Sequence, residues 1–389
     1  MRVCHVITRL IVGGAQENTI ASVLGLREQG GFHVSLIAGP TTGPEGSLEP
    51  RVAGIPGLLV LEPALVRPVH PWKDLLGWRR LTSHFRRLRP DLVHTHSGKA
   101  GILGRFAARS ARVPLVVHGI HGPSFGPWQG TAANRLFTTA ERRAARCTTH
   151  FVTVADAMKE QYLAAGIGRP EQFTRIFSGF DLNPYLQATN APAVRSALGL
   201  EAEDLVIGKI ARLFRLKGHD DLLDAAPAIV RACPRARFLL VGDGLWRDRL
   251  ETRARGLGLE RHFVFSGLRP PEEIPTLVGV MDVLVHLSRR EGLARALPQA
   301  MAAGKPVVSW DCDGAREVCR EDETGFLLHP GDVAGLVDVL TRLAGDAGLR
   351  ARLGGRGRAL VRESFSVERM VAELAGLYHR LAAAAGMEP

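Results

Sequence analysis

The apolar residues of this chain fall into short runs that alternate with longer amphipathic stretches. Residues 2–8 form such a run, a glycine pair follows, and a helical pattern then extends to about Gly30. The same order of strand, glycine-containing turn and helix begins again at Leu205. Runs that are apolar at nearly every position are typical of parallel strands buried on both faces. The pattern therefore predicts an α/β protein with helices covering parallel sheets.

With 389 residues, the chain is long enough for about two domains. A stretch that contains proline and alanine, residues 183–204, separates the two series of strands and helices and is interpreted as a linker. We therefore predict a Rossmann-like domain over residues 1–184 and a second one over residues 185–365. Helical patterns cover residues 331–343, 349–362 and 367–384.

Residues 291–306 carry the clearest chemical signal. A strand-like run, residues 282–287, leads to Glu291, and an Ala- and Leu-rich segment beginning at Gly292 predicts a helix that ends near Gly304. The first turn of a helix placed there would offer free N–H groups to an anion. The Glu291 carboxylate could accept hydrogen bonds from hydroxyl groups of the same ligand. A phosphate joined to a polyol describes a sugar nucleotide; the alternative is a charged helix start that binds nothing.

A second pair of charges lies after the strand at residues 205–213. Arg212 and Lys217 flank a loop between this strand and a helix, so both cations could converge on one diphosphate. The alternative for both is an ordinary surface charge. In the first half, Gly13 and Gly14 form a strand-to-helix turn that could bring backbone close to a phosphate, or could be a tight connection without a ligand.

Together these stretches resemble the family 4 retaining glycosyltransferases, the glycosyl transferases group 1. Glu291 with Gln299 eight positions later is similar to the E-x7-E signature, with glutamine in place of the second glutamate. Arg212 and Lys217 match an R-x4-K pair, and His121-Gly122 resembles the family's histidine-glycine motif. Residues 178–181, read SGFD, resemble an SGxD turn. The resemblance covers nearly the whole chain.

The resemblance implies the GT-B fold, in which two Rossmann-like domains face a central cleft, and a C-terminal helix from residue 366 to residue 389 that packs back on the first domain. It implies contact of Glu291 and His121 with the donor sugar, and of Gln299 with the nucleotide ribose. The predicted catalytic residues are His121, Arg212, Lys217 and Glu291. The predicted donor-binding residues are Gly13, Gly14, Gly244, Leu268, Arg269, Gly292, Leu293, Ala294 and Gln299.

Other motifs resemble known binding sites only in part. Gly242-Asp243-Gly244 begins like a dinucleotide fingerprint, but Arg247 occupies the position of the third glycine. Residues 311–313, read DCD, form a DxD interpreted as a loop with solvated acids. Four histidines, His94, His96, His118 and His121, lie near two predicted strand ends and could suggest a metal. Because the HxH pair lacks a carboxylate third ligand in register, we predict no metal site, and we interpret His118 as a core histidine.

The net charge of +11 indicates an acidic partner. Only 6% of the residues are aromatic and no RNA-binding signature is visible, so we predict no nucleic acid partner and favour phosphates or an anionic membrane. The amphipathic helix at residues 72–88 places Leu75, Leu76, Leu81, Phe85 and Leu88 on one side and four arginines on another. That basic side is either a solvated face or a contact with anionic lipid.

No apolar run reaches the roughly 20 residues of a membrane span, and five scattered cysteines lack a CxxC spacing. We therefore expect a cytoplasmic protein, with a peripheral location at the inner face of the cell membrane left open.

The predicted function is transfer of a sugar from a nucleoside diphosphate sugar, a UDP-sugar first of all, to a hydroxyl of a glycan or lipid-linked acceptor. The setting would be assembly of cell-surface polysaccharide or glycolipid, and no cofactor or metal is expected. Two alternatives stay open: a GT-B sugar-nucleotide epimerase, and a non-catalytic basic protein that binds nucleotide sugars or membranes.

Overall fold

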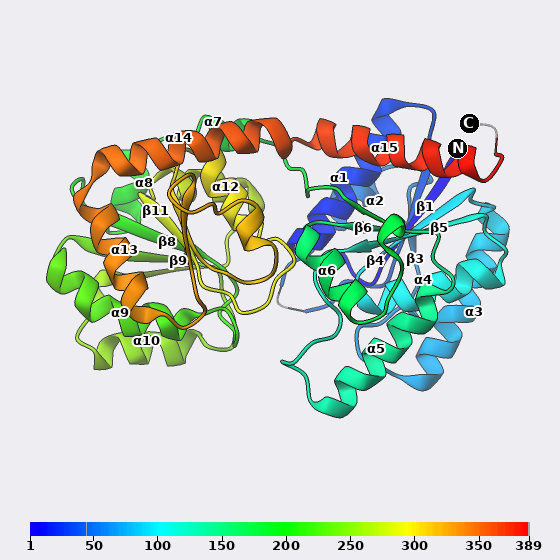
Figure 1. Ribbon diagram of the computed structural model, residues 1–389, viewed down its shortest axis with the longest axis horizontal. Helices are drawn as coiled ribbons and strands as arrows, with labels where there is room; N and C mark the ends of the chain where they lie inside the picture. Colours follow the sequence, from blue (N-terminus) through cyan, green and yellow to red (C-terminus); the bar gives the residue numbers. More distant parts are fainter. Residues whose placement is uncertain (44, 388–389) are drawn as a thin grey trace. The chain divides into compact units, whose positions relative to one another are not determined.

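The computed structural model describes residues 1–43 and 45–387, and the chain forms two compact units (Figure 1). The first comprises Met1–Phe180 together with the segment that begins at Val367, and the second comprises Asp181–Ser366. The predicted division lay at residues 184 and 185, four positions further along. The last two residues of the predicted C-terminal segment, 388 and 389, lie outside the described residues.

Within the described residues, the first unit is built on a seven-stranded sheet in the order β3-β2-β1-β4-β5-β6-β7, with all strands parallel. Its strands are β1 (Arg2–Ile7), β2 (His33–Ala38), β3 (Leu59–Leu61), β4 (Leu92–His96), β5 (Leu115–Ile120), β6 (His150–Thr153) and β7 (Phe173–Arg175). Its helices are α1 (Gly14–Gln29), α2 (Pro50–Ala53), α3 (Pro71–Leu88), α4 (Gly98–Ser110), α5 (Thr131–Ala145), α6 (Asp156–Ala164), the 3-10 helix η1 (Pro170–Gln172) and α15 (Val367–Ala384).

Alternation along the strands distributes two cores over the two faces of this sheet. Val3 and Ile7 of β1 pack with residues of α1 and α15, including Tyr378. Cys4 and Val6, which point the other way, pack with residues of α3 and α4. The C-terminal helix α15 therefore completes the core of the first unit.

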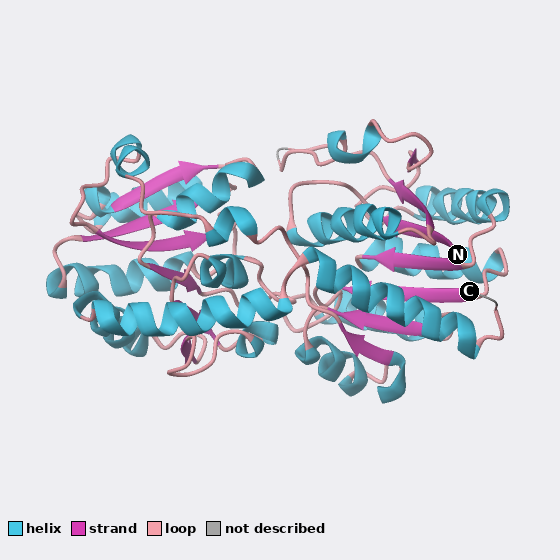
Figure 2. Cartoon of the chain, turned by 90° about the horizontal axis from the view of Figure 1, so that it is seen from above, coloured by secondary structure: helices cyan, strands magenta, loops and turns pink. Residues whose placement is uncertain are grey.

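The second unit contains, among the described residues, a six-stranded parallel sheet in the order β10-β9-β8-β11-β12-β13. Its strands are β8 (Leu205–Ile210), β9 (Ala236–Val241), β10 (Phe263–Gly267), β11 (Val283–His286), β12 (Val307–Trp310) and β13 (Gly325–Leu328). Its helices are α7 (Asn183–Leu186), α8 (Pro192–Ala197), α9 (His219–Ala232), α10 (Arg247–Gly256), η2 (Glu260–His262), η3 (Pro271–Glu273), α11 (Ile274–Gly279), α12 (Ala296–Ala302), η4 (Asp313–Glu317), α13 (Val333–Gly345) and α14 (Ala347–Ser364). In each unit, helices lie on both sides of the strands (Figure 2). The prediction of an α/β protein with two parallel-sheet units is confirmed.

Two local predictions are wrong. The stretch at residues 183–204 is not a plain linker, because it forms α7 and α8, each with a proline in its first turn, where proline is tolerated. In α3, Leu81 and Phe85 are buried as expected, but Leu75 and Leu76 are 40% and 45% exposed. Leu75 lies four residues before Arg79, one helical turn away, and so shares the arginine side of the helix.

Across the described residues, no helix is both long and apolar enough to cross a membrane.

Candidate functional site

All strand pairs of the second unit are parallel, so the carboxyl ends of its strands meet at one edge of the sheet. Chain order runs outward from β8 in both directions, through β9 and β10 on one side and through β11, β12 and β13 on the other. The point between β8 and β11 is therefore the topological switch point, where open α/β sheets bind their ligands. Lys217 follows β8 and Glu291 follows β11.

Lys217 and Glu291 form an ion pair at this switch point, with Nζ of Lys217 donating to Oε1 of Glu291. The two side chains are 18% and 24% exposed, so the pair is partly buried. Nε2 of His286, the last residue of β11, lies 3.5 Å from the same carboxylate oxygen. Burial alone would raise the pKa of Glu291, but the charge of Lys217 and the contact with His286 hold the pKa well below its ordinary value. Glu291 is therefore an ionised hydrogen-bond acceptor at neutral pH.

The backbone at Glu291 is held from the loop after β12. The N–H of Glu291 donates to Oδ2 of Asp313 at 2.6 Å, and the N–H of Gly314 donates to the carbonyl of Gly292 at 2.9 Å. Asp313 is the second acid of the DxD sequence at residues 311–313, for which a loop with solvated acids was predicted. In the structure Asp313 fixes the position of Glu291, a role that its sequence context does not indicate.

The helix predicted to begin at Gly292 begins later. The helix α12 covers Ala296–Ala302, and residues 291–295 are irregular. The two hydrogen bonds to the β12 loop hold the backbone of Glu291 and Gly292 away from helical geometry. Gly292, Leu293 and Ala294 therefore present a loop at the site, not the first turn of a helix.

The loop after β8 packs directly on the loop after β11. Gly218 has a φ of +65°, and a Cβ there would lie 1.9 Å from the carbonyl oxygen of Leu287. Only glycine accommodates both the left-handed backbone and this close approach. The N–H of Arg289 donates to the carbonyl of Leu216 at 2.8 Å. These contacts bring Lys217 to Glu291, although 74 residues separate the two in sequence.

The other predicted residues of this unit follow neighbouring strands at the same edge. Arg212 lies on the loop after β8, with its guanidinium 5.3 Å from the centroid of the Phe214 ring. Gly244 follows β9, and a Cβ there would lie 2.6 Å from the carbonyl oxygen of Leu213. Leu268, which is 49% exposed, and Arg269 follow β10. Gln299 lies within α12 and is buried, with 9% exposure.

One charged residue near the pair was not singled out from the sequence. Lys209 of β8 is 1% exposed, and its Nζ has no hydrogen-bond partner in the part of the chain that the structure describes. Burial and the nearby charge of Lys217 lower its pKa to about 7, although Asp221 and Glu291 act in the opposite direction. The signal in the sequence is a lysine inside an otherwise apolar strand.

The remaining predicted residues belong to the first unit. Gly13 precedes α1 as its N-cap, and Gly14 is its first residue. His121 follows β5, and its Nε2 lies 2.9 Å from Nδ1 of His96. His118 is on the opposite face of the sheet, where its Nδ1 lies 2.9 Å from Oγ1 of Thr95. The structure therefore separates His118 from the other histidines.

Comparison with known proteins agrees with this geometry. Residues 13–176 match the family model described as the glycosyl transferase 4-like domain, and residues 190–360 match the one described as glycosyl transferases group 1. The chain is 29% identical over 320 residues to the UDP-Gal:alpha-D-GlcNAc-diphosphoundecaprenol alpha-1,3-galactosyltransferase of Escherichia coli, which covers 81% of this chain and 82% of that protein. The chain belongs to the family 4 glycosyltransferases.

Two further relatives agree with this assignment. The 2-deoxystreptamine N-acetyl-D-glucosaminyltransferase of Streptomyces fradiae is 32% identical over 275 residues, which cover 67% of this chain and 63% of that protein. The crystal structure of HepE from Anabaena in complex with UDP matches with a TM-score of 0.80 at 25% identity, covering 98% of this chain and 100% of that one. The predicted GT-B fold of this glycosyltransferase is confirmed.

The buried lysine of the glycosyltransferase has a consequence for stability. The unfolded chain protonates Lys209 below its ordinary pKa of 10.5, whereas the folded chain does so only below about 7. Between these two pH values the unfolded state binds more protons than the folded state. Lys209 therefore lowers the free energy of unfolding most at low pH, and this destabilisation disappears as the pH rises toward 10.5.

We therefore expect Lys209→Met to raise the free energy of unfolding, by on the order of 4 kcal/mol at pH 6 and by about 1 kcal/mol at pH 10. Urea denaturation at the two pH values measures the difference. Lys73→Met, at an exposed position of α3, controls for the loss of one positive charge. An equal gain in the free energy of unfolding at both pH values would contradict the lowered pKa of a buried Lys209 amino group.

Proposed function

We propose that this glycosyltransferase transfers a sugar from a UDP-sugar to a hydroxyl group with retention of the anomeric configuration. The observation that carries the proposal is the Lys217–Glu291 pair at the switch point of the second unit. An ionised carboxylate there can accept hydrogen bonds from sugar hydroxyls, and the adjacent ammonium can bind the diphosphate. The Escherichia coli relative is named for UDP-Gal, and the Anabaena structure contains UDP. Both support uridine as the nucleoside of the donor.

In this proposal the diphosphate leaves with its charge stabilised by the protein. Lys217 has three N–H donors, so it can bind a phosphate oxygen while it stays paired with Glu291. Arg212, on the same loop, adds a second cation. Charge developing on the leaving oxygen is stabilised electrostatically, and that oxygen can accept the proton of the attacking hydroxyl. Neither a metal nor another cofactor is needed in this scheme.

The proposal assigns roles to the remaining predicted residues. Gly244, Leu268, Arg269, Gly292, Leu293 and Ala294 would contact the nucleotide or the sugar. Gln299 would bind the ribose through its amide, with less charge assistance than a carboxylate gives. In the first unit, His121 would contact the donor sugar, and Gly13 and Gly14 would lie beside the diphosphate and the acceptor.

The acceptor that we propose is a glycan or a lipid-linked sugar in cell-surface polysaccharide or glycolipid assembly. The acceptor in the name of the Escherichia coli relative is linked to diphosphoundecaprenol. An enzyme that acts on such a lipid would be brought close to its acceptor by binding the membrane, and the surface of α3 has the side chains for such binding.

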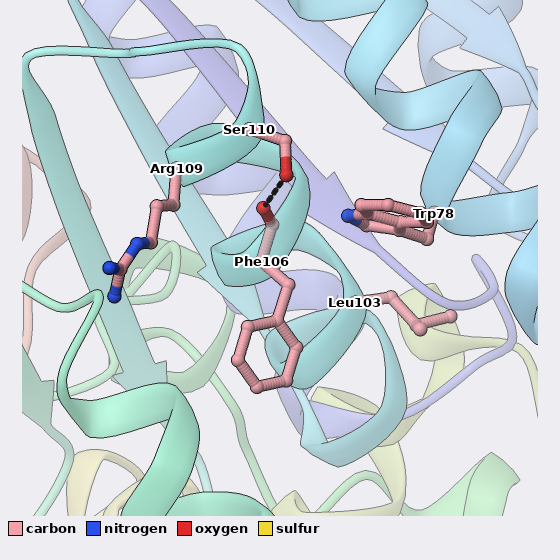
Figure 3. Close-up of a pocket in the computed structure, with 5 residues that line it drawn as sticks. All are labelled: Trp78, Leu103, Phe106, Arg109 and Ser110. Atoms are coloured by element: carbon pink, nitrogen blue, oxygen red, sulfur yellow. Dashed lines mark hydrogen bonds between the residues drawn. The ribbon is translucent and has the colours of Figure 1, made fainter.

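The exposed side of α3 combines apolar and cationic side chains. Trp72 is 76% exposed, and Leu75 and Leu76 are on the same side as Arg79. Next to α3, a hollow of about 420 Å³ is lined by Trp78, Leu103, Phe106, Arg109 and Ser110. Figure 3 shows Trp78 and Leu103 on the same side of α4. Apolar groups beside arginines suit the interface of an anionic bilayer, where the apolar groups insert and the arginines bind headgroups.

The first test is release of nucleoside diphosphate from a panel of UDP-, GDP-, ADP- and dTDP-sugars, with and without a membrane lipid extract and EDTA. We expect release of UDP from one UDP-sugar, stimulated by the extract and unchanged by EDTA. The anomeric configuration of the product, read by NMR, decides retention. An epimerised sugar nucleotide formed without the extract would establish the epimerase instead, and binding of a donor without any release of diphosphate would favour the non-catalytic alternative.

Lys217→Ala should lower kcat by about 100-fold to 1,000-fold, since it removes a charge that opposes the developing negative charge. The measurement is UDP release at saturating donor and acceptor, after circular dichroism has confirmed folding. Lys159→Ala, on α6, is the matched control and should keep wild-type turnover. Near-normal turnover of Lys217→Ala would rule out the proposed role of this lysine.

Membrane contact is tested by co-sedimentation with vesicles of phosphatidylglycerol and phosphatidylcholine. Replacing Arg79 and Arg80 by serine should weaken binding by about 2 kcal/mol, roughly thirtyfold, because each arginine near an anionic surface contributes about 1 kcal/mol. Trp72→Ser with Leu76→Ser should weaken it further. Leu245→Ser removes an 86% exposed leucine of the second unit and should have no effect. Equal binding to vesicles of pure phosphatidylcholine and to vesicles that contain phosphatidylglycerol would contradict an electrostatic contribution of the arginines.

A further inference from the structure

Three histidines of the first unit lie together on one face of its sheet. His5 of β1 is the register partner of His94 of β4, and His96 follows two positions later, so the three side chains project to the same side. Their ring centroids are 5.1 Å (His5 to His94), 5.2 Å (His5 to His96) and 4.2 Å (His94 to His96) apart. No metal was predicted because the HxH pair lacks a carboxylate third ligand in register, but the neighbouring strand β1 places a third imidazole, His5, beside the pair.

The ring nitrogens of this histidine cluster are close enough for one metal ion. One nitrogen from each ring lies within 4.8 Å of the chosen nitrogen of the other two. Around a tetrahedral zinc ion, with Zn–N bonds of about 2.0–2.1 Å, the ligand nitrogens are about 3.4 Å apart. Nδ1 of His5 and Nε2 of His96 are already 2.9 Å apart. Coordination would require the widest of these separations, at most 4.8 Å, to shorten toward about 3.4 Å.

The lone pairs needed for such a site are available. Among the described residues, Nε2 of His94 is buried and has no hydrogen-bond partner, and Nδ1 of His5 and Nε2 of His96 contact each other. The side chains of His5, His94 and His96 are 0%, 2% and 1% exposed, so burial favours their neutral, ligating form. A buried polar atom without a hydrogen-bond partner is rare in proteins, and a metal ion would give Nε2 of His94 a partner.

The cluster also has the second layer of hydrogen bonds that orients metal-bound histidines. Oη of Tyr378, in α15, lies 2.6 Å from Nδ1 of His94. Nε2 of His121 lies 2.9 Å from Nδ1 of His96. When one ring nitrogen binds a metal, the other usually makes such a bond, which fixes the tautomer and the ring orientation.

Gly119 leaves room beside the rings. It is the register partner of His96 in β5, and a Cβ there would lie 3.0 Å from Nε2 of His94 and 3.0 Å from Nδ1 of His96. A cavity of about 10 Å³, lined in part by His94, His96 and Gly119, is near the size that one water molecule requires. A water there would approach the ion from the side of His94 and His96, because His5 does not line this cavity.

We propose that His5, His94 and His96 bind one divalent transition-metal ion of the class of Zn²⁺. Three imidazole nitrogens without a carboxylate select zinc, cobalt, nickel or copper over magnesium, calcium and manganese. Bound through Nε2 of His96, the ion would leave the ring proton on Nδ1, which then donates to Nε2 of His121. The ion would tie β1 to β4, and through Tyr378 to α15. The proposal rests on the histidine geometry alone and does not depend on the proposed function, although the site adjoins His121.

The test is titration of the full-length chain, freed of any histidine tag and of metal, with Co²⁺ and with Zn²⁺. We expect one ion per chain, a visible Co²⁺ spectrum of tetrahedral type, and a zinc X-ray absorption signal with nitrogen neighbours. Zinc should also raise the melting temperature, because an ion that binds only the folded state stabilises it.

Variants assign the ligands. His5→Phe, His94→Gln and His96→Gln should each weaken binding at least tenfold. His118→Gln, at an equally buried histidine on the opposite face, is the matched control and should bind like the wild type. If the cluster variants fail to fold, the spectra and stoichiometry of the wild type still decide. Absence of binding at micromolar metal, binding retained in all three variants, or equal loss in His118→Gln would overturn the proposal.

Discussion

The parallel pairing of β8 and β11 is the constraint on which the candidate site depends. It places the carboxyl ends of both strands at one edge, and the reversal of chain order there leaves the loops after them side by side. Gly218 then allows the loop after β8 to approach the loop after β11 more closely than a residue with a Cβ atom could. Lys217 and Glu291 meet as a result of these two backbone features, so the ion pair depends on the backbone arrangement.

The sequence predicted the fold well where hydrophobic periodicity is strong. The helix α15 covers the predicted helical pattern at residues 367–384, because a long amphipathic pattern marks it. The short elements α7 and α8 were missed, since four to six residues carry too little periodicity to distinguish a helical turn from a linker. In α3, the apolar pattern did not reveal that Leu75 and Leu76 face solvent, because exposure there depends on which turn reaches the sheet.

The candidate site divides in the same way. Lys217 and Glu291 were predicted from their places after strands, and the structure brings them together. The later start of α12 could not be predicted, because it follows from hydrogen bonds to Asp313 and Gly314 on a loop about 20 residues away in sequence. The third histidine of the cluster was missed for a similar reason: His5 and His94 are neighbours only through strand register, which a single sequence does not display.

The charges around Glu291 suggest why the site is ready for an anionic donor. Glu291 stays ionised because Lys217 and His286 outweigh its burial, while Lys209, deeper in β8, is pushed toward its neutral form by burial and by Lys217. A diphosphate placed beside Lys217 would add negative charge near Lys209 and so favour its protonated form. Such a negative charge would act on Lys209 in the same direction as Asp221 and Glu291 already do.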